Sequence, residues 1–246
     1  MSAAPIRERG ILFSAPMMLA NLAGTKTMTR RVVKPQPSAA VDGVIVDQAL
    51  DMNGTKRGLR AWFLEGDVPD GDGNGVPSPY GQPGDLLWFR EAWRTYKSLD
   101  LVAPRDLHIG ERVRYEADGM ERLGRFDEAG LDPAATTAPQ WGRLRPGMFM
   151  PRWASRFIAE VTEVRVECLQ DISRGDAMAE GCPFPNMAQG PDPRQWYAGL
   201  WEGINGAGAW AANPWVWVVE FRKTPNVRVE PPAEGRSAPT RCSASG

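Results

Sequence analysis

Residues 24–33, with the sequence GTKTMTRRVV, join a predicted helix to a predicted strand and decide the fold that we expect. Upstream, Ser14 is typical of an N-cap and is followed by good helix formers. Gly24 predicts the end of this helix, since glycine readily adopts the left-handed conformation at the C′ position. The β-branched pair Val32-Val33 indicates that an extended segment follows.

The other periodic segments are mostly short strands. The clearest is residues 215–221, which are apolar at nearly every position, as in a central strand covered on both faces. Residues 171–180 predict a short helix with Ser173 as N-cap, and residues 192–206 predict a second. In the latter, Trp196, Leu200 and Ile204 form an apolar stripe. Further strands are predicted at 10–13, 86–91, 112–115 and 156–168.

Long polar stretches separate these elements. Residues 35–80 are rich in Pro, Gly and Asp and are interpreted as mostly irregular, and residues 95–150 as a second polar insertion. A shorter loop spans about 182–192. Residues 224–246 show no periodicity and predict a disordered tail. We therefore expect one domain over residues 1–223, interrupted by three insertions.

The composition excludes several classes of site. The chain has 246 residues, of which 42% are hydrophobic and 24% charged, as in ordinary globular proteins. Its three cysteines include no C-x-x-C pair, so a disulfide framework and a zinc knuckle are not expected. The only histidine, His108, lies in a polar stretch and is interpreted as a surface residue. We expect neither a metal nor a cofactor.

Charge and hydropathy restrict the partners. The net charge of −1 favours a small ligand, or a short stretch of RNA or DNA, over a long polynucleotide. No apolar stretch approaches the roughly 18 residues of a membrane helix, and none resembles a signal peptide. A cytoplasmic protein without a membrane partner is therefore expected, and its oligomeric state is left open.

Four blocks of sequence, taken in order, resemble one known family. The first is residues 24–30, and the second is Pro83-Gly84-Asp85 before a strand. Residues 169–181 and 200–217 supply the third and fourth blocks. Together they are similar to the ASCH domain of the PUA-like superfamily, most of all to its long phage and prophage members. This resemblance spans about residues 10–223 and implies an α+β fold, a PUA-like β-barrel with a few short helices, long loop insertions and a nucleotide-like ligand.

The resemblance also implies a reaction. Some small ASCH proteins are amidohydrolases that remove the acyl group of N4-acetylcytidine with a lysine, a threonine and a glutamate. These residues match Lys26, Thr29 and Glu180. The chemistry suits the residue types, because amide hydrolysis needs a nucleophile, a base and a proton donor. Thr29 is the predicted nucleophile, Lys26 the base if burial lowers its pKa, and Glu180 the acid/base partner.

Lys26 and Thr29 meet only if the chain bends between them, because residues three apart in a regular strand face opposite sides. Each residue also has an ordinary structural interpretation, as an exposed lysine, a strand threonine or a solvated helix-end glutamate. Candidate substrate-binding residues are Arg30, Arg31, Arg90, Glu91 and Trp93. Arg30 and Arg31 either bind phosphate or face solvent, and Trp93 either stacks on a base or packs in the core.

Three functions are compatible with these patterns. The first is a hydrolase acting on the exocyclic N4 amide of acylated cytidine-type nucleosides. The second is a PUA-like module that binds RNA or modified nucleic acid without turnover. The third and weakest is a ribonuclease, which would need an unusual mechanism with a single histidine and no metal cluster. The near-neutral charge favours the first over the second.

Overall fold

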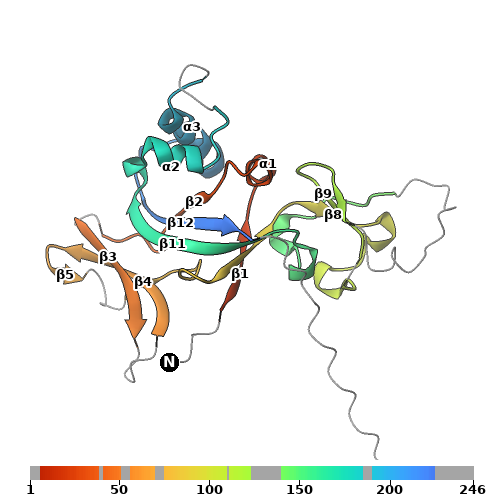
Figure 1. The fold of residues 1–246 in the computed structure, drawn as a ribbon, viewed down its shortest axis with the longest axis horizontal. Coiled ribbons are helices and arrows are strands. Elements are labelled where there is room, and N and C mark those ends of the chain that lie inside the picture. The colour runs from red at the N-terminus through yellow and green to blue at the C-terminus, as the bar shows by residue number, and fades with distance from the viewer. Residues whose placement is uncertain are drawn as a thin grey trace, which may run out of the picture.

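A computed structural model describes residues 6–38, 41–50, 56–69, 75–109, 111–122, 140–184 and 190–224. Its main element is a five-stranded sheet (Figure 1). In order, the strands are β1 (Glu8–Leu12), β7 (Leu86–Arg90), β11 (Ile158–Cys168), β12 (Trp215–Lys223) and β2 (Met28–Val32). β1 pairs with β7 in parallel, and the other pairs are antiparallel.

The predicted α+β class is confirmed, because the described residues form mostly strands with a few helices. The strand pairs of these residues do not close into a barrel, and β1 and β2 stand at the two edges of the sheet. The predicted strands at 10–13, 86–91, 112–115, 156–168 and 215–221 all coincide with observed strands within a few residues.

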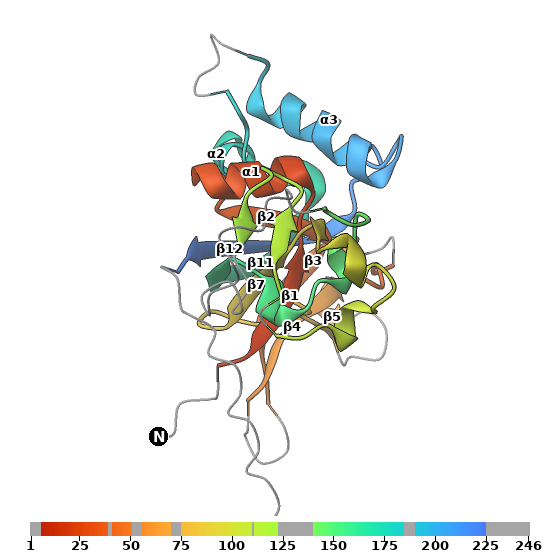
Figure 2. The same cartoon turned by 90° about the vertical axis from the view of Figure 1, so that its right-hand side faces the viewer.

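β12 is the central strand that its apolar run predicts. Val216 and Val218 face a cluster that includes Tyr197 and Trp201 of helix α3. Trp217, Val219 and Phe221 face the opposite cluster. Because successive side chains of a strand point to opposite faces, this alternation buries the strand between two apolar layers. Figure 2 shows α2 and α3 on one side of the sheet and β4 on the other.

The helices begin and end where their capping residues predict. α1 (Ala15–Ala23) ends at Gly24, which has a left-handed φ of 76°. α2 (Arg174–Ala179) begins at Ser173, whose side chain accepts a hydrogen bond from the N–H of Asp176. α3 (Pro193–Asn205) begins at Asp192, which accepts from the N–H of Arg194. Ser14 occupies the N-cap position of α1, but its hydroxyl makes no capping hydrogen bond.

The predicted apolar stripe of α3 is displaced. Tyr197 and Trp201 are the buried aromatic residues of the helix, whereas Ile204 is 59% exposed. The stripe is displaced by about one residue because Tyr197 and Trp201 are buried in the cluster with Val216 and Val218, whereas Leu200 packs against that cluster only partly buried.

The interpretation of residues 35–80 as irregular is wrong. β3 (Gly43–Leu50) and β4 (Lys56–Glu65) form an antiparallel pair, with short strands β5 (Val68–Pro69) and β6 (Val76–Pro77) beside β4. Phe63 is buried and packs edge-on against Trp215 at 5.4 Å between ring centroids. Both strands carry short apolar runs, at 44–46 and 61–64, but the Pro, Gly and Asp residues around them give the whole segment a loop-like composition.

The insertion at 95–150 is also partly structured. β8 (Trp93–Arg94), β9 (Val113–Tyr115) and β10 (Glu121–Arg122) form a small sheet, to the right of the main sheet in Figure 1. Trp93, Tyr115 and Met150 are among the buried residues of its own core. Short 3-10 helices accompany it and the end of β11, at Lys97–Leu99, Pro104–Asp106, Gly147–Phe149, Arg152–Ala154 and Leu169–Asp171.

Other predicted segments fall partly outside the described residues. His108 is exposed, as predicted. The predicted tail lies outside the described residues from 225 onward, and the amide N–H of Thr224 still donates to the carbonyl of Ile158 at 3.0 Å. Within the described ranges, no helix combines the length and apolar character needed to cross a membrane.

Candidate active site

A pocket of about 330 Å³ lies between the start of α1, strand β2 and helix α3. Its volume is within the usual range of small-molecule sites. Lys26, Thr29 and Glu180 all border it. The structure therefore brings together the three residues predicted to be catalytic, although Lys26 and Glu180 are 154 positions apart in the sequence.

The position of β2 explains how neighbouring residues reach one pocket. β2 is an edge strand of the main sheet, so side chains from both of its faces can border a space at that edge. Lys26 precedes β2 and forms an isolated antiparallel bridge with Glu180 at the end of α2. Because Lys26 lies before β2 and pairs with the end of α2, whereas Thr29 pairs with β12, the strict alternation of a regular strand does not extend from Thr29 to Lys26.

Lys26 and Glu180 form a buried ion pair. The Nζ atom of Lys26 lies 2.6 Å from Oε2 of Glu180 and 3.0 Å from its backbone carbonyl oxygen. Their side chains are only 2% and 3% exposed. Burial lowers the pKa of Lys26, the charge and hydrogen bond of Glu180 oppose this effect, and the nearby Arg31 and Arg30 lower the pKa further. The net result is a pKa below the usual 10.5.

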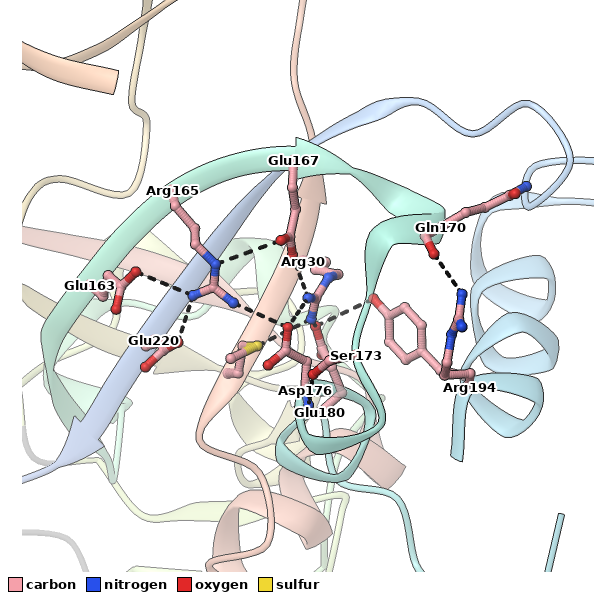
Figure 3. A network of polar contacts seen from close by, with 12 residues as sticks. Arg30, Glu163, Arg165, Glu167, Gln170, Ser173, Asp176, Glu180, Arg194 and Glu220 are labelled. Carbon is pink, nitrogen blue, oxygen red and sulfur yellow. Dashed lines mark hydrogen bonds and ion pairs between the residues drawn. The ribbon is translucent and has the colours of Figure 1, made fainter. Parts of the chain in front are cut away.

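Arg30 is enclosed by carboxylates rather than open to a ligand (Figure 3). Its Nη2 atom lies 2.5 Å from Glu167 and 2.6 Å from Asp176, and Nη1 lies 3.5 Å from Oε1 of Glu180. The Arg30 side chain is 0% exposed. Arg165 extends the network through a 3.2 Å contact with Asp176. Arg30 therefore joins β2 to β11 and α2 and holds Glu180 from the side opposite Lys26.

Tyr197 is a site residue that the sequence analysis missed. Its hydroxyl donates to Oε1 of Glu180 at 3.4 Å, and the residue is 3% exposed. Burial and the charge of Glu180 raise the pKa of Tyr197 well above 10. Tyr197 lies four positions before Trp201, on the same buried face of α3, and a buried tyrosine needs a polar partner for its hydroxyl. This spacing was the signal in the sequence that could have identified Tyr197.

Thr29 and Arg31 both border the pocket with unused hydrogen-bonding capacity. Thr29 is 3% exposed, and its hydroxyl has no hydrogen-bond partner in the described part of the chain. Arg31 donates from Nη2 to the carbonyl of Leu12 at 2.5 Å. Its Nε atom is buried without a partner, and no described carboxylate pairs with it.

The structure does not bring Arg90, Glu91 or Trp93 to this pocket. Arg90 stacks on Trp88, with its guanidinium 4.4 Å from the ring centroid. Glu91 is 1% exposed and binds Arg156 through two contacts of 2.8 Å. Trp93 is fully buried in the core of the small sheet. These residues stabilise the junction between the two sheets, and only their neighbour Ala92 borders the pocket.

No protein-family model, curated protein or solved structure matches the chain. Within the described ranges, no three or more His, Cys, Asp or Glu side chains are grouped so that they could hold a metal ion.

Proposed function

We propose that this protein is an amidohydrolase that removes acyl groups from the exocyclic N4 amide of cytidine-type nucleosides, on a fold of the PUA-like ASCH type. The observation that carries the proposal is that the buried Lys26–Glu180 pair shares a pocket with Thr29, whose hydroxyl has no hydrogen-bond partner among the described residues. Nucleophile, base and acid are then within one enclosed pocket, as acyl transfer requires.

The ion pair supplies both the base and the acid of the reaction. Transfer of one proton from Nζ of Lys26 to Oε2 of Glu180, along their 2.6 Å contact, leaves a neutral amine and a carboxylic acid. The amine accepts the proton of Thr29 as its oxygen attacks the acyl carbon. The acid protonates the leaving N4 nitrogen as the C–N bond breaks. Water then hydrolyses the threonine ester, releasing the carboxylic acid product.

A second candidate, a module that binds the modified base without turnover, is favoured by one feature of the same pair. An ammonium group held by a carboxylate and a carbonyl is charged in its resting state and cannot act as a base. In that case Lys26 and Glu180 would present hydrogen-bonding groups to the base edge. The two candidates differ in whether the pair releases its proton when the ligand enters.

Chromatographic analysis of N4-acetylcytidine and of a longer N4-acylcytidine incubated with the full chain separates the two candidates. Hydrolysis predicts cytidine from wild type and essentially none from Thr29→Ala. Thr27→Ala is the matched control, because Thr27 is an exposed threonine two positions away. Full turnover by Thr29→Ala would refute the nucleophile, whereas ligand binding without any cytidine would favour the binding module.

A further inference from the structure

One end of the pocket is lined by a cation that has no carboxylate partner in the described part of the chain. Lys26 is paired with Glu180, and Arg30 is paired with Glu167 and Asp176. Arg31 is the third cation of the pocket lining, and no described carboxylate lies within ion-pair distance of it. Because Arg31 is only half-buried and has no carboxylate partner among the described residues, its guanidinium is available to an anion that enters the pocket.

The guanidinium of Arg31 is fixed beside the start of α1. It donates to the carbonyl of Leu12, two positions before Ser14, and lies 5.5 Å from the ring of Phe13. Ser14 and Ala15 border the same pocket. The first-turn N–H groups of a helix have no intrahelical acceptor and carry the positive end of its dipole. Two positive features therefore converge on one end of the pocket.

Neither feature is neutralised by a carboxylate of the residues that the structure describes. The Ser14 hydroxyl makes no capping hydrogen bond, and the first turn of α1 contains no acidic residue. Thr29 also borders the pocket and is only 3% exposed, and its hydroxyl has no hydrogen-bond partner in the described ranges. Three hydrogen-bonding side chains and a helix N-terminus thus share one enclosed space with unused donors.

We propose that this end of the pocket binds the phosphate group of a nucleotide, held by Arg31, the Ser14 hydroxyl and the first-turn N–H groups of Ala15 and Met17, since Pro16 between them has no N–H. The inference rests on the proposed function and makes its substrate an acylated cytidine monophosphate rather than a free nucleoside. A phosphate monoester provides three acceptor oxygens, which suits a guanidinium combined with a helix N-terminus.

The test is calorimetric titration of the full chain with cytidine monophosphate, cytidine and inorganic phosphate. Wild type is expected to bind the monophosphate at least about tenfold more tightly than cytidine, since hydrogen bonds between charged groups are the strong ones. Inorganic phosphate should compete with the monophosphate. Equal binding of monophosphate and cytidine, or binding of neither monophosphate nor inorganic phosphate, would overturn the subsite.

Variants separate recognition from folding. Arg31→Gln should remove the preference for the monophosphate, and Arg31→Lys should keep part of it. Arg222→Gln is the control, because Arg222 is 72% exposed on β12 and pairs with Glu160 away from the pocket. Ser14→Asp places a carboxylate at the proposed phosphate position. It should abolish the preference while keeping or raising the Tm, because aspartate is a good N-cap residue. A preference that survives both Arg31→Gln and Ser14→Asp would overturn the proposal.

The subsite and the reaction can fail separately. If acylated cytidines are not hydrolysed but the monophosphate preference depends on Arg31, the phosphate subsite stands and the amidohydrolase is wrong. If acylated cytidine is hydrolysed and the monophosphate shows no advantage in either binding or kcat/KM, the reaction stands and the subsite is wrong.

Discussion

At the scale of single residues, the Lys26–Glu180 pair makes stability and catalysis depend on the same atoms. Glu180→Gln leaves the buried Lys26 ammonium without its main partner, and we expect a loss of about 3–5 kcal/mol in the free energy of unfolding. The double variant Lys26→Met with Glu180→Leu should recover most of that loss, because it removes both charges. Urea denaturation measures the stability of all three proteins.

The same variants should behave differently in turnover. Both the single and the double variant are expected to be inactive on N4-acetylcytidine, so stability returns without activity. A stable and active double variant would show that the pair is structural only. Unchanged stability in Glu180→Gln would show that Lys26 does not depend on this carboxylate.

Asp176 should make the protein sensitive to acid. Burial alone raises the pKa of Asp176, but the hydrogen bond and charge of Arg30, with Arg165, bring it below its usual 3.8. The folded state thus releases this proton more readily than the unfolded chain. The stabilisation is present above pH 3.8 and is lost as the pH falls through the lower, folded-state pKa.

Thermal unfolding from about pH 6 to about pH 3 tests this dependence. Wild type should lose more Tm over the acid range than Asp176→Asn, whose side chain does not titrate. Parallel curves for the two proteins would show that the Arg30 network contributes nothing to acid sensitivity.

Arg30 itself illustrates a limit of sequence analysis. Its sequence context allowed either a phosphate ligand or exposure to solvent, whereas its actual partners come from β11 and α2.

At the scale of elements, capping residues were the most reliable signals. Gly24, Ser173 and Asp192 all mark helix boundaries as predicted, because capping depends on local backbone geometry. The stripe of α3 was less accurate, because which residues of a helix are buried depends on the neighbouring surface. Tyr197 and the displaced burial of α3 are consequences of packing that a single helix cannot encode.

Two glycines isolate the contribution of backbone conformation. Neither Gly24 nor Gly199 has an atom within 4 Å of an added Cβ, but only Gly24 has positive φ, at 76°. Gly24→Ala should therefore destabilise the protein by about 1 kcal/mol. Gly199→Ala, inside α3, should stabilise it by about 0.5–1 kcal/mol. Urea denaturation of both variants checks the opposite signs, and two changes of the same sign would contradict this interpretation.

At the scale of the whole molecule, the main sheet and the helices on one side of it were predictable, but the β3–β4 layer on the other side was not. Apolar and β-branched residues marked β7, β11 and β12 as strands, and β12 in particular required cover on both faces. The cover on one face comes from β3 and β4, whose short apolar runs lie among segments rich in Pro, Gly and Asp. The cluster of Lys26, Thr29 and Glu180 was predicted only through resemblance, since no local pattern joins residues so far apart in sequence.

If the β3–β4 pair covers one face of the main sheet, its buried side chains should contribute to the stability of the protein. Phe63 is 5% exposed and packs with Trp215, whereas Ile45 on the partner strand is 52% exposed. Phe63→Ala should lower the free energy of unfolding by about 3–5 kcal/mol, as expected for a buried phenylalanine. Ile45→Ala should change it by less than about 0.5 kcal/mol. If both variants unfold at the wild-type urea concentration, the pair does not cover the sheet in solution, and the irregular interpretation of residues 35–80 would be restored.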